Sequence, residues 1–507
     1  MRSPCFGNRF FSARAARAIL PLLGALAPAA CAWADGVPVA MTDATLQVTT
    51  AVSGLSSPIA MVFLGPDDYL VLEKNSGRIR RVTGGVIQAT PALDLAVNNN
   101  SERGLLSIAL APGFSKNGLA YIRWTESSTG ADSGSVLETP LLGNRIDVFH
   151  WDGAAFTQQG NVLRLRALQT DNILVPGQTG GTNTGAAGNH NGGVIRFGPD
   201  GKLYVFMGDN GRRGWLQNLS NGPFLTAPNV DDTFGGPAPD NAHLTGVILR
   251  LNLDGSAPSD NPFFAAGASI GGEVGANVQK VYSYGHRNGF GMAFDPQTGF
   301  LWETENADDA FSELNRVVPG MNGGWIQMMG PQSRFAQFKF IETTQFTQAL
   351  QQVRFPPTRL AYTASLAQAR MFMLPGAVYR DPELSWVYEI GPSGAVFVQG
   401  AALGSAYTGT YWFGSSRAFS QVGANGGSLY CIRLTADRLS VDTSADIRLK
   451  DHVADNVFRA NKFDGTESES LVVGRGFGIV PDLVQGPDGA VYAVSNTDNC
   501  IYKISRP

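Results

Sequence analysis

Two histidines are candidates for chemistry, because each lies in a glycine-flanked loop just ahead of an apolar strand pattern. His190 occurs in GNHNGG and His286 occurs in YGHRNGFGMAF. An imidazole changes charge near neutral pH and can take a proton from a hydroxyl group, so a loop histidine that faces a cleft is a candidate general base. A structural histidine with satisfied hydrogen bonds is the alternative at both positions, and it is the stronger alternative for His286.

The residues that follow His286 add a cation and an amide. Arg287 can stabilise developing negative charge if it faces the same cleft, and it can equally pair with a nearby carboxylate. Further along, residues 305–313 (ENADDAFSE) are rich in carboxylates and loop carbonyls, the hard oxygen ligands that Ca²⁺ prefers. The spacing is not that of an EF-hand, so a solvated acidic loop is the alternative to a calcium site.

The elements that must position these residues follow a repeated pattern of strand, turn and strand. In residues 192–209 a β-branched and aromatic run precedes Pro199-Asp200-Gly201, a turn in which glycine permits positive φ, and an apolar strand returns at 203–207. His190 and His286 each precede one such unit, so we expect both loops to open on the same face. The other units are residues 57–82, 104–124, 289–305, 393–416 and 481–496.

Six copies of a small sheet, each unable to bury both faces alone, are best satisfied by a radial arrangement around an axis. The sequence therefore predicts an all-β fold, a six-bladed β-propeller with residues 35–507 as one domain. A pair of β-sandwiches is the alternative, but sandwiches need no repeated unit. Residues 217–242 and 331–370 interrupt the repeat, and we expect them as loop insertions on one face, over the axial cleft. Outer strands are expected in residues 246–255, 428–434 and 499–504.

The first 34 residues have the pattern of a secretory signal peptide. They contain four arginines, an apolar run over residues 18–30 and the small-x-small sequence Ala32-Trp33-Ala34. A lipoprotein signal at Cys31 is the alternative, and Pro28 argues against it. No later run reaches the roughly 18 apolar residues of a transmembrane helix. We therefore expect an exported protein, periplasmic or secreted, with no membrane span.

Charge and cysteine content exclude two classes of partner. Removal of residues 1–34 lowers Lys+Arg from 38 to 34 against 42 Asp+Glu, a formal charge of −8, which argues against nucleic acid. No C-x-x-C-H motif occurs, which excludes a c-type haem. Cys431 and Cys500 lie in similar short strands; an exported pair can form a disulfide, and two buried unpaired thiols are the alternative.

Six blocks of sequence carry a resemblance to a known family. In order they are GLLSIALAPGF, HNGGVIRFGPDGKLYVFMGDNG, GVILRLNLDGS followed by DNPF, YGHRNGFGMAFDPQTG, ENADDAFSELN followed by NGGW, and PSGAVF. Together they resemble the soluble PQQ-dependent aldose (glucose/sorbosone-type) dehydrogenases across nearly all of residues 35–507. The resemblance implies a six-bladed propeller that holds pyrroloquinoline quinone (PQQ) and Ca²⁺ at one end of its axis. It also implies oxidation of an aldose sugar or related alcohol on behalf of a separate electron acceptor.

The resemblance implies roles for single residues around the cofactor. The family's general base corresponds to His190, and Asn189 stands where the family has an acidic residue. The pair that contacts the quinone corresponds to Arg287, which would stabilise charge on the reduced oxygen, and Asn288, which would position the cofactor. Arg417 aligns with a late lysine that contacts PQQ, so the charge is kept while the geometry changes.

For the metal, the resemblance implies that two loop carbonyls ligate the cofactor's calcium, and these correspond to Ala307 and Asp308. A further calcium ligand corresponds to Glu313. Gly323 lies at a position whose backbone carbonyl helps to hold calcium in the family.

Two departures from the family pattern bear on cofactor binding. Glu102 replaces a glutamine and would place negative charge near the carboxylates of PQQ. A pair of arginines before the last unit is missing from GRGFGIVPDLV, so anchoring would fall to Arg417, Arg475, Arg212 or Arg213. The missing arginines favour a different class of function, a non-catalytic propeller that binds carbohydrate or protein. A calcium-dependent lactonase-like hydrolase is a third alternative.

Overall fold

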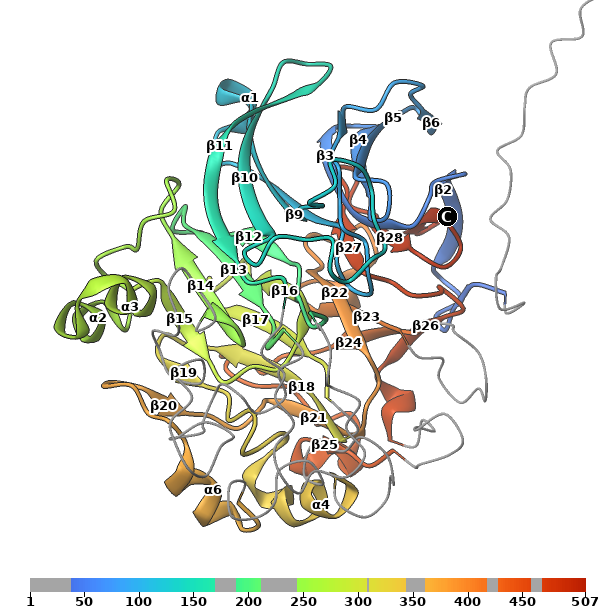
Figure 1. The fold of residues 1–507 in the computed structure, drawn as a ribbon. Coiled ribbons are helices and arrows are strands. Elements are labelled where there is room, and N and C mark those ends of the chain that lie inside the picture. Colours follow the sequence, from blue (N-terminus) through green and yellow to red (C-terminus); the bar gives the residue numbers. More distant parts are fainter. Residues whose placement is uncertain are drawn as a thin grey trace, which may run out of the picture.

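The described part of the chain consists of sheets with a few short helices at their edges (Figure 1). The computed structural model describes residues 38–168, 188–210, 244–307, 310–342, 361–416, 427–456 and 467–507. The expected signal peptide, the insertion at 217–242 and four of the expected site residues lie outside these ranges. Those four are Arg212, Arg213, Asp308 and Arg417.

The strands of the described residues form six sheets. The sheets are numbered in the chain order of their inner strands, and the inner strand of each sheet is named first below. The first contains β3 (Pro58–Gly65), β4 (Asp68–Glu73), β5 (Arg78–Thr83), β6 (Val86–Ile87) and β7 (Leu93–Asp94), and the second contains β8 (Leu105–Leu110), β9 (Leu119–Thr125), β10 (Asn144–Trp151) and β11 (Phe156–Leu165). The third contains β12 (Ile195–Phe197), β13 (Leu203–Met207), β14 (Val247–Leu251), β15 (Val281–Tyr284), β19 (Met321–Asn322) and β20 (Val378–Tyr379).

The remaining three sheets are built in the same way, with an antiparallel pair of strands at the inner side. The fourth contains β16 (Gly289–Phe294), β17 (Leu301–Glu305), β18 (Ala310–Val317), β21 (Leu384–Tyr388) and β25 (Val453–Ala454). In the fourth sheet the last pair, β21 and β25, is parallel. The fifth contains β22 (Pro392–Phe397), β23 (Tyr411–Ser415), β24 (Leu429–Ile432), β26 (Val472–Arg475) and β1 (Ala40–Met41), and the sixth contains β27 (Asp482–Gln485), β28 (Val491–Ser495), β29 (Cys500–Ser505) and β2 (Gln47–Ser53).

The strands named first above, here called the inner strands, form a closed ring because each contacts the next. β3 lies against β8, β8 against β12, β12 against β16, β16 against β22, β22 against β27, and β27 against β3. Sheets arranged radially around such a ring are a β-propeller, so the predicted all-β propeller fold is confirmed. Each predicted strand-turn-strand unit supplies the first two strands of one sheet, and the expected outer strands are β14, β24 and β29.

Strands from the two ends of the described chain complete the same sheets. β2 pairs with β29 in the sixth sheet, and β1 pairs with β26 in the fifth. Residues near position 50 are therefore hydrogen-bonded to residues near position 500, and this pairing joins the last sheets of the ring to its beginning.

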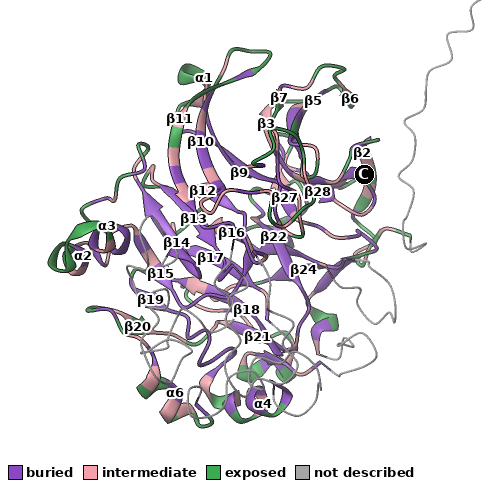
Figure 2. Ribbon diagram, in the orientation of Figure 1, coloured by how far each residue is buried: buried purple, intermediate pink, exposed green. Residues whose placement is uncertain are grey.

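The core lies between neighbouring sheets, where the strands are almost continuously buried (Figure 2). β4 shows how one strand serves two interfaces: Leu70 and Leu72 pack toward the second sheet, while Tyr69 and Val71 pack toward the sixth. Successive side chains of a strand point to opposite faces, so a sheet that is covered on both sides needs apolar residues at every position.

Short helices occur outside the sheets. They are α1 (Phe114–Asn117), α2 (Phe264–Ile270), α3 (Gly272–Val278), α4 (Phe335–Phe340) and α6 (Ala364–Arg370), with 3₁₀ turns η3 (Gln332–Arg334), η5 (Ser405–Tyr407), η6 (Ile447–Asp451) and η7 (Ser468–Ser470). The second expected insertion is thus partly helical: Phe335 and Phe338 of α4 belong to one buried cluster with Trp325 and with residues of the fourth sheet, which packs this segment against that sheet.

Two further expectations concern cysteines and membranes. Cys431 is a buried free thiol, so the expected alternative of a Cys431–Cys500 disulfide is wrong. Cys431 and Cys500 both lie in strands that pack in the core. A free cysteine behaves as a small apolar side chain, so its packing explains Cys431 without a disulfide. None of the helices in the described residues is long and apolar enough to cross a membrane.

Candidate active site

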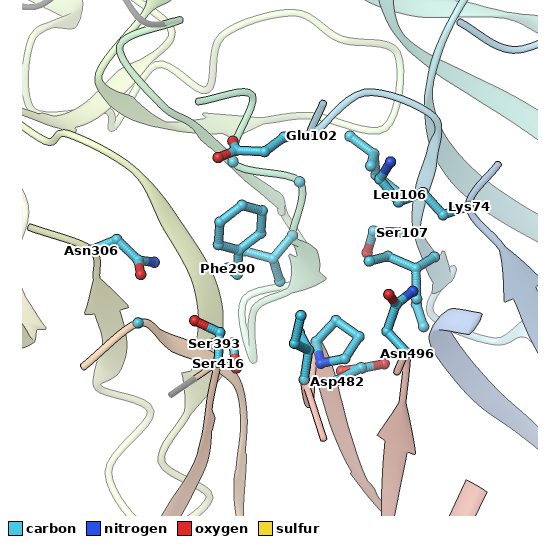
Figure 3. Close-up of a pocket in the computed structure, with 18 of the residues that line it drawn as sticks. Lys74, Glu102, Leu106, Ser107, Phe290, Asn306, Ser393, Ser416, Asp482 and Asn496 are labelled. Carbon is cyan, nitrogen blue, oxygen red and sulfur yellow. The ribbon is translucent and has the colours of Figure 1, made fainter. Parts of the chain in front are cut away.

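A cavity of about 270 Å³ lies on the axis of the ring (Figure 3). Each of the six inner strands contributes to its wall, which places it where the sheets converge. The wall combines small and apolar residues with polar and charged side chains, among them Lys74 and Glu102. The residues from the inner strands include Ala60, Ser107, Arg196, Phe290, Ser393 and Asp482.

The loop that carries His190 is held from three directions just before β12. His190 has a φ of +56°, a left-handed conformation that is uncommon for residues other than glycine, and its carbonyl accepts a hydrogen bond of 3.2 Å from the amide of Asn210. The buried guanidinium of Arg123 donates to the carbonyl of Asn191. A side chain at Gly208 would lie 2.4 Å from the His190 carbonyl oxygen, so only glycine fits there. Strain at His190 is thus maintained by its surroundings.

His190 forms a chain of hydrogen bonds with residues far away in sequence. Its Nδ1 lies 2.7 Å from Oδ1 of Asp209, and the other oxygen of Asp209 accepts a 3.0 Å hydrogen bond from Nε1 of Trp325. Its Nε2 lies 3.2 Å from Nη2 of Arg287. A guanidinium can only donate, so Nε2 accepts and the ring proton lies on Nδ1, where it is donated to Asp209. This tautomer leaves the basic lone pair on Nε2.

Arg287 and Asn288 connect this group to the axial cavity. Nη1 of Arg287 donates to the carbonyl of Asn306, a cavity residue, at 2.9 Å. Asn288 donates from Nδ2 to the carboxylate of Glu102, at 3.1 and 3.3 Å from its two oxygens, and Glu102 also lines the cavity. His190 is 4% exposed and does not line the cavity, so Glu102 and Asn306 separate the two.

Cations at the cavity are sparse among the described residues. Lys74 lines it, and burial lowers the pKa of its ammonium to about 8 while Glu102 raises it in part. Arg196 is engaged with Asp482 at 2.8 Å. Arg475 ends β26, pairs with Ala40 of the edge strand β1 and is exposed, and it is not among the residues that line the cavity, so its role as a cofactor anchor stays a prediction.

A second cluster of titratable groups lies behind Arg287. Nδ1 of His286 is 3.0 Å from Glu305 and 3.7 Å from Glu303, and its Nε2 is 2.9 Å from Oγ of Ser283. The amide of Arg287 donates to Glu305. His286, Glu303 and Glu305 are each at most 1% exposed, so this histidine is fully enclosed.

Glu313 continues the second cluster. It is the cross-strand partner of Glu305, and Nδ2 of Asn315 donates to both Glu303 (2.8 Å) and Glu313 (3.0 Å). Burial, followed by the charge of Glu305, raises the pKa of the carboxyl groups of Glu303 and Glu313 well above their usual range. The cluster therefore binds either protons or a cation.

The other expected site residues are placed as follows. Ala307 is buried two residues after the end of β17. Gly323 is packed against His286, because a Cβ at this position would lie 3.5 Å from Nδ1 of His286. Gly323 therefore borders the second cluster. Asn189 is partly buried, and no hydrogen bond joins its side chain to another described residue.

Four residues of the clusters and the cavity were not predicted from the sequence. Asp209 hydrogen-bonds to His190, Trp325 hydrogen-bonds to Asp209, and Lys74 lines the cavity; no local sequence pattern indicates these positions. Glu303 could have been found, because Glu303 and Glu305 are two positions apart on one strand and must share a face.

Known proteins resemble this chain in sequence. The family model described as Glucose / Sorbosone dehydrogenase matches residues 55–379. Quinoprotein glucose dehydrogenase B of Acinetobacter calcoaceticus is 28% identical over 282 residues, which are 55% of this chain and 52% of that protein. The chain spans 52% to 62% of the length of three curated relatives that it matches.

Solved structures resemble it in fold. The apo-form of the soluble aldose sugar dehydrogenase of Escherichia coli has 19% identity and a TM-score of 0.57, with 91% of this chain and 100% of that chain covered. The PQQ-bound aldose sugar dehydrogenase of Streptomyces coelicolor has 21% identity and a TM-score of 0.52, with coverage of 91% and 98%. Identities this low show a shared fold, whereas the family model covers more than half of the sequence. The chain belongs to the glucose/sorbosone dehydrogenase family.

Proposed function

We propose that this protein is an exported quinoprotein that oxidises an aldose sugar or a related alcohol, with His190 as the general base. One observation carries the proposal: Nδ1 of His190 lies against Asp209 and Nε2 against the donor Arg287, which places the ring proton on Nδ1 and the basic lone pair on Nε2. A base that must accept a hydroxyl proton needs this tautomer.

The residues at the cavity fit PQQ at one end of the axis. Phe290 supplies an aromatic surface, glycines 192 and 193 leave the wall flat, and Lys74 supplies a cation for a carboxylate. Arg287 and Asn288 border the cavity through Asn306 and Glu102. When bound, PQQ would supply a two-electron acceptor for the hydride that leaves the sugar carbon.

The residues of the chain then divide the remaining work. His190 accepts the substrate's hydroxyl proton at Nε2, and Asp209, fixed by Trp325, stabilises the imidazolium that results. Arg287 is held by the carbonyl of Asn306 and lies 5.6 Å from the Trp325 ring, so its charge is oriented before the reaction and can stabilise a developing negative oxygen.

Calcium is the second part of the proposal. We assign it to the residues that the family resemblance indicates: Ala307, Asp308, Glu313 and Gly323. Glu313 supports this assignment because it is a buried carboxylate with no ion-pair partner among the described residues. Removal of calcium by a chelator should lower the melting temperature and cofactor uptake together; no change in either overturns the calcium assignment.

The proposal also covers architecture and location. We take the six sheets as six blades of one domain that spans residues 35–507, following a signal peptide of residues 1–34. Periplasmic or secreted location, a sugar as the small-molecule substrate and a separate electron acceptor belong to the same proposal. Support comes from the arginine-rich, apolar N-terminus and from the family to which the chain belongs.

The experiment mixes purified protein with PQQ and Ca²⁺, records the spectrum of bound quinone, and then adds a panel of aldoses with a dye as artificial electron acceptor. Uptake of PQQ followed by sugar-dependent bleaching is expected. Absence of uptake at micromolar PQQ overturns the dehydrogenase proposal.

A non-catalytic propeller that binds carbohydrate or protein is the second candidate. Ile479 and Pro481 favour it, because they line the cavity in the tract where the family's late arginines are missing. Binding of a sugar to protein that takes up no PQQ, measured by calorimetry, would identify this alternative.

A further inference from the structure

We propose that His286, Glu303 and Glu305 form a buried site for a zinc ion, behind the cavity and next to Glu313 and Gly323, which are assigned to calcium. The ligand atoms of these three side chains all lie within 4.8 Å of one another, and all three residues are buried. The inference goes beyond the proposed function, because the site would hold its metal whether or not PQQ binds.

The separations between the ligand atoms suit a small ion. Zn²⁺ binds histidine nitrogen and carboxylate oxygen at about 2.0–2.2 Å, so two ligands of a tetrahedral site are about 3.4 Å apart. His286 Nδ1 lies 3.0 Å from Glu305 Oε2 and 3.7 Å from Glu303 Oε1, on either side of that value. Small side-chain movements therefore convert the present contacts into a coordination sphere.

Each of the three residues is also oriented by a neighbour. Ser283 lies 2.9 Å from Nε2 of His286, so that nitrogen can keep the ring proton while Nδ1 binds the metal. Asn315 donates to Glu303, and the amide of Arg287 donates to Glu305. Metal ligands are commonly held in this way by second hydrogen bonds.

An unsatisfied atom points to a missing ligand. Oε2 of Glu303 is buried and has no hydrogen-bond partner among the described residues. No lysine or arginine of the described residues forms an ion pair with Glu303, Glu305 or Glu313, so His286 is the only basic side chain at the cluster. Buried carboxylates normally pair with a cation or coordinate a metal.

The imidazole nitrogen decides between zinc and calcium. Ca²⁺ takes oxygen ligands, whereas imidazole suits Zn²⁺. Binding of Zn²⁺ to Nδ1 displaces the proton that His286 shares with Glu305, and this proton is released to solvent. Because Glu305 also accepts from the amide of Arg287, the metal would fix the main chain of the residue that faces His190.

The test measures metal in protein expressed in zinc-supplemented medium and desalted, by mass spectrometry of the metal. Wild type should carry about one zinc ion per chain, and Glu303→Gln, which keeps the shape but removes a ligand charge, should carry at least about tenfold less. Glu73→Gln is the matched control, because Glu73 is a buried carboxylate of the first sheet, and it should retain zinc. Melting temperature confirms that the variants are folded.

A second measurement does not depend on any variant folding. Wild type grown with Co²⁺ in place of zinc should show the visible absorption of tetrahedral cobalt. The proposal is overturned if folded wild type contains no zinc and shows no cobalt band, or if calcium is the only metal found. It is also overturned if Glu303→Gln carries as much zinc as wild type. PQQ uptake is recorded in the same samples: its loss with zinc still present argues against the proposed function and leaves the zinc site standing.

Discussion

His190 and His286 precede neighbouring repeat units in similar glycine-flanked loops, yet the structure gives them opposite surroundings. His190 faces one carboxylate, Asp209, and one cation, Arg287, so charge is balanced and a lone pair is directed toward the cation. His286 faces two carboxylates, with a third adjoining, and no lysine or arginine of the described ranges forms an ion pair with these carboxylates. The balanced cluster reaches the cavity through Asn306, which lines the cavity and accepts a hydrogen bond from Arg287, whereas the unbalanced cluster is enclosed.

The difference teaches that the partners of a histidine, and not its loop, determine its role. An imidazole held between an acceptor and a donor is ready for proton transfer. An imidazole among carboxylates is suited to a cation. The two clusters meet at Arg287, whose side chain belongs to the first and whose amide belongs to the second.

Replacement of the base should have the largest effect. His190→Ala should lower the dye-coupled rate on the order of 10²–10⁴-fold, with little change in PQQ affinity, because Lys74, Arg287 and Asn288 remain. His150→Ala, at an exposed strand end, is the control. Near-normal turnover by folded His190→Ala would remove His190 from the mechanism. The contrast between the roles of His190 and His286 would then be wrong.

Asp209→Asn should come next. An amide at this position can donate to Nδ1 and so favour the tautomer with the proton on Nε2, which then opposes Arg287 instead of accepting from it. We expect a loss on the order of 10²-fold in kcat, the low end for a positioned base, with PQQ uptake retained. Equal losses of rate and of melting stability would point to a structural role for the pair.

A smaller effect is expected at the edge of the cavity. Glu102→Gln removes a negative charge close to an anionic cofactor while keeping an acceptor for Asn288. Relief of about 1 kcal/mol of repulsion, the value for unit charges 4 Å apart in water, corresponds to about fivefold tighter PQQ binding by titration. Weaker binding would mean that Glu102 is directed away from the cofactor.

The smallest effect is a pH dependence. Lys74 carries its charge below a pKa of about 8 and loses it above, because burial disfavours the ammonium form. Affinity for PQQ should therefore fall by a few-fold, and by at most about tenfold, between pH 7 and pH 9. Lys74→Arg should flatten this slope, since arginine stays charged. A slope that persists in Lys74→Arg assigns the titration to another group.

The sequence was sufficient for the hairpins and insufficient for the clusters. Alternating apolar residues around a Pro-Asp-Gly turn depend on neighbours a few positions away, so β12 and β13 lie where they were predicted. The Asp209–Trp325 hydrogen bond spans 116 positions and arises only when the third sheet has formed. No local pattern encodes such a contact.

The same argument applies to Arg475. Its position in the chain near the last unit suggested a place close to the axis, but β26 is the fourth strand of the fifth sheet, counted outward from β22, and Arg475 does not line the cavity. In a propeller, the distance from the axis depends on strand order within the sheet, and a few residues of chain cross from the rim to the centre. Ile479 and Pro481, only a few residues later, line the cavity.

The pairing of β2 with β29 constrains the order in which the molecule can be assembled. During synthesis the N-terminal strand emerges first, yet its hydrogen-bonding partner, residues 500–505, is made more than four hundred residues later. Until then β2 lacks the one strand that it pairs with in the described structure, and exposed strand edges invite pairing with other chains. A chain with this pairing therefore benefits from staying unfolded until its last strand is available, and loss of residues 500–505 would leave β2 without its pairing partner.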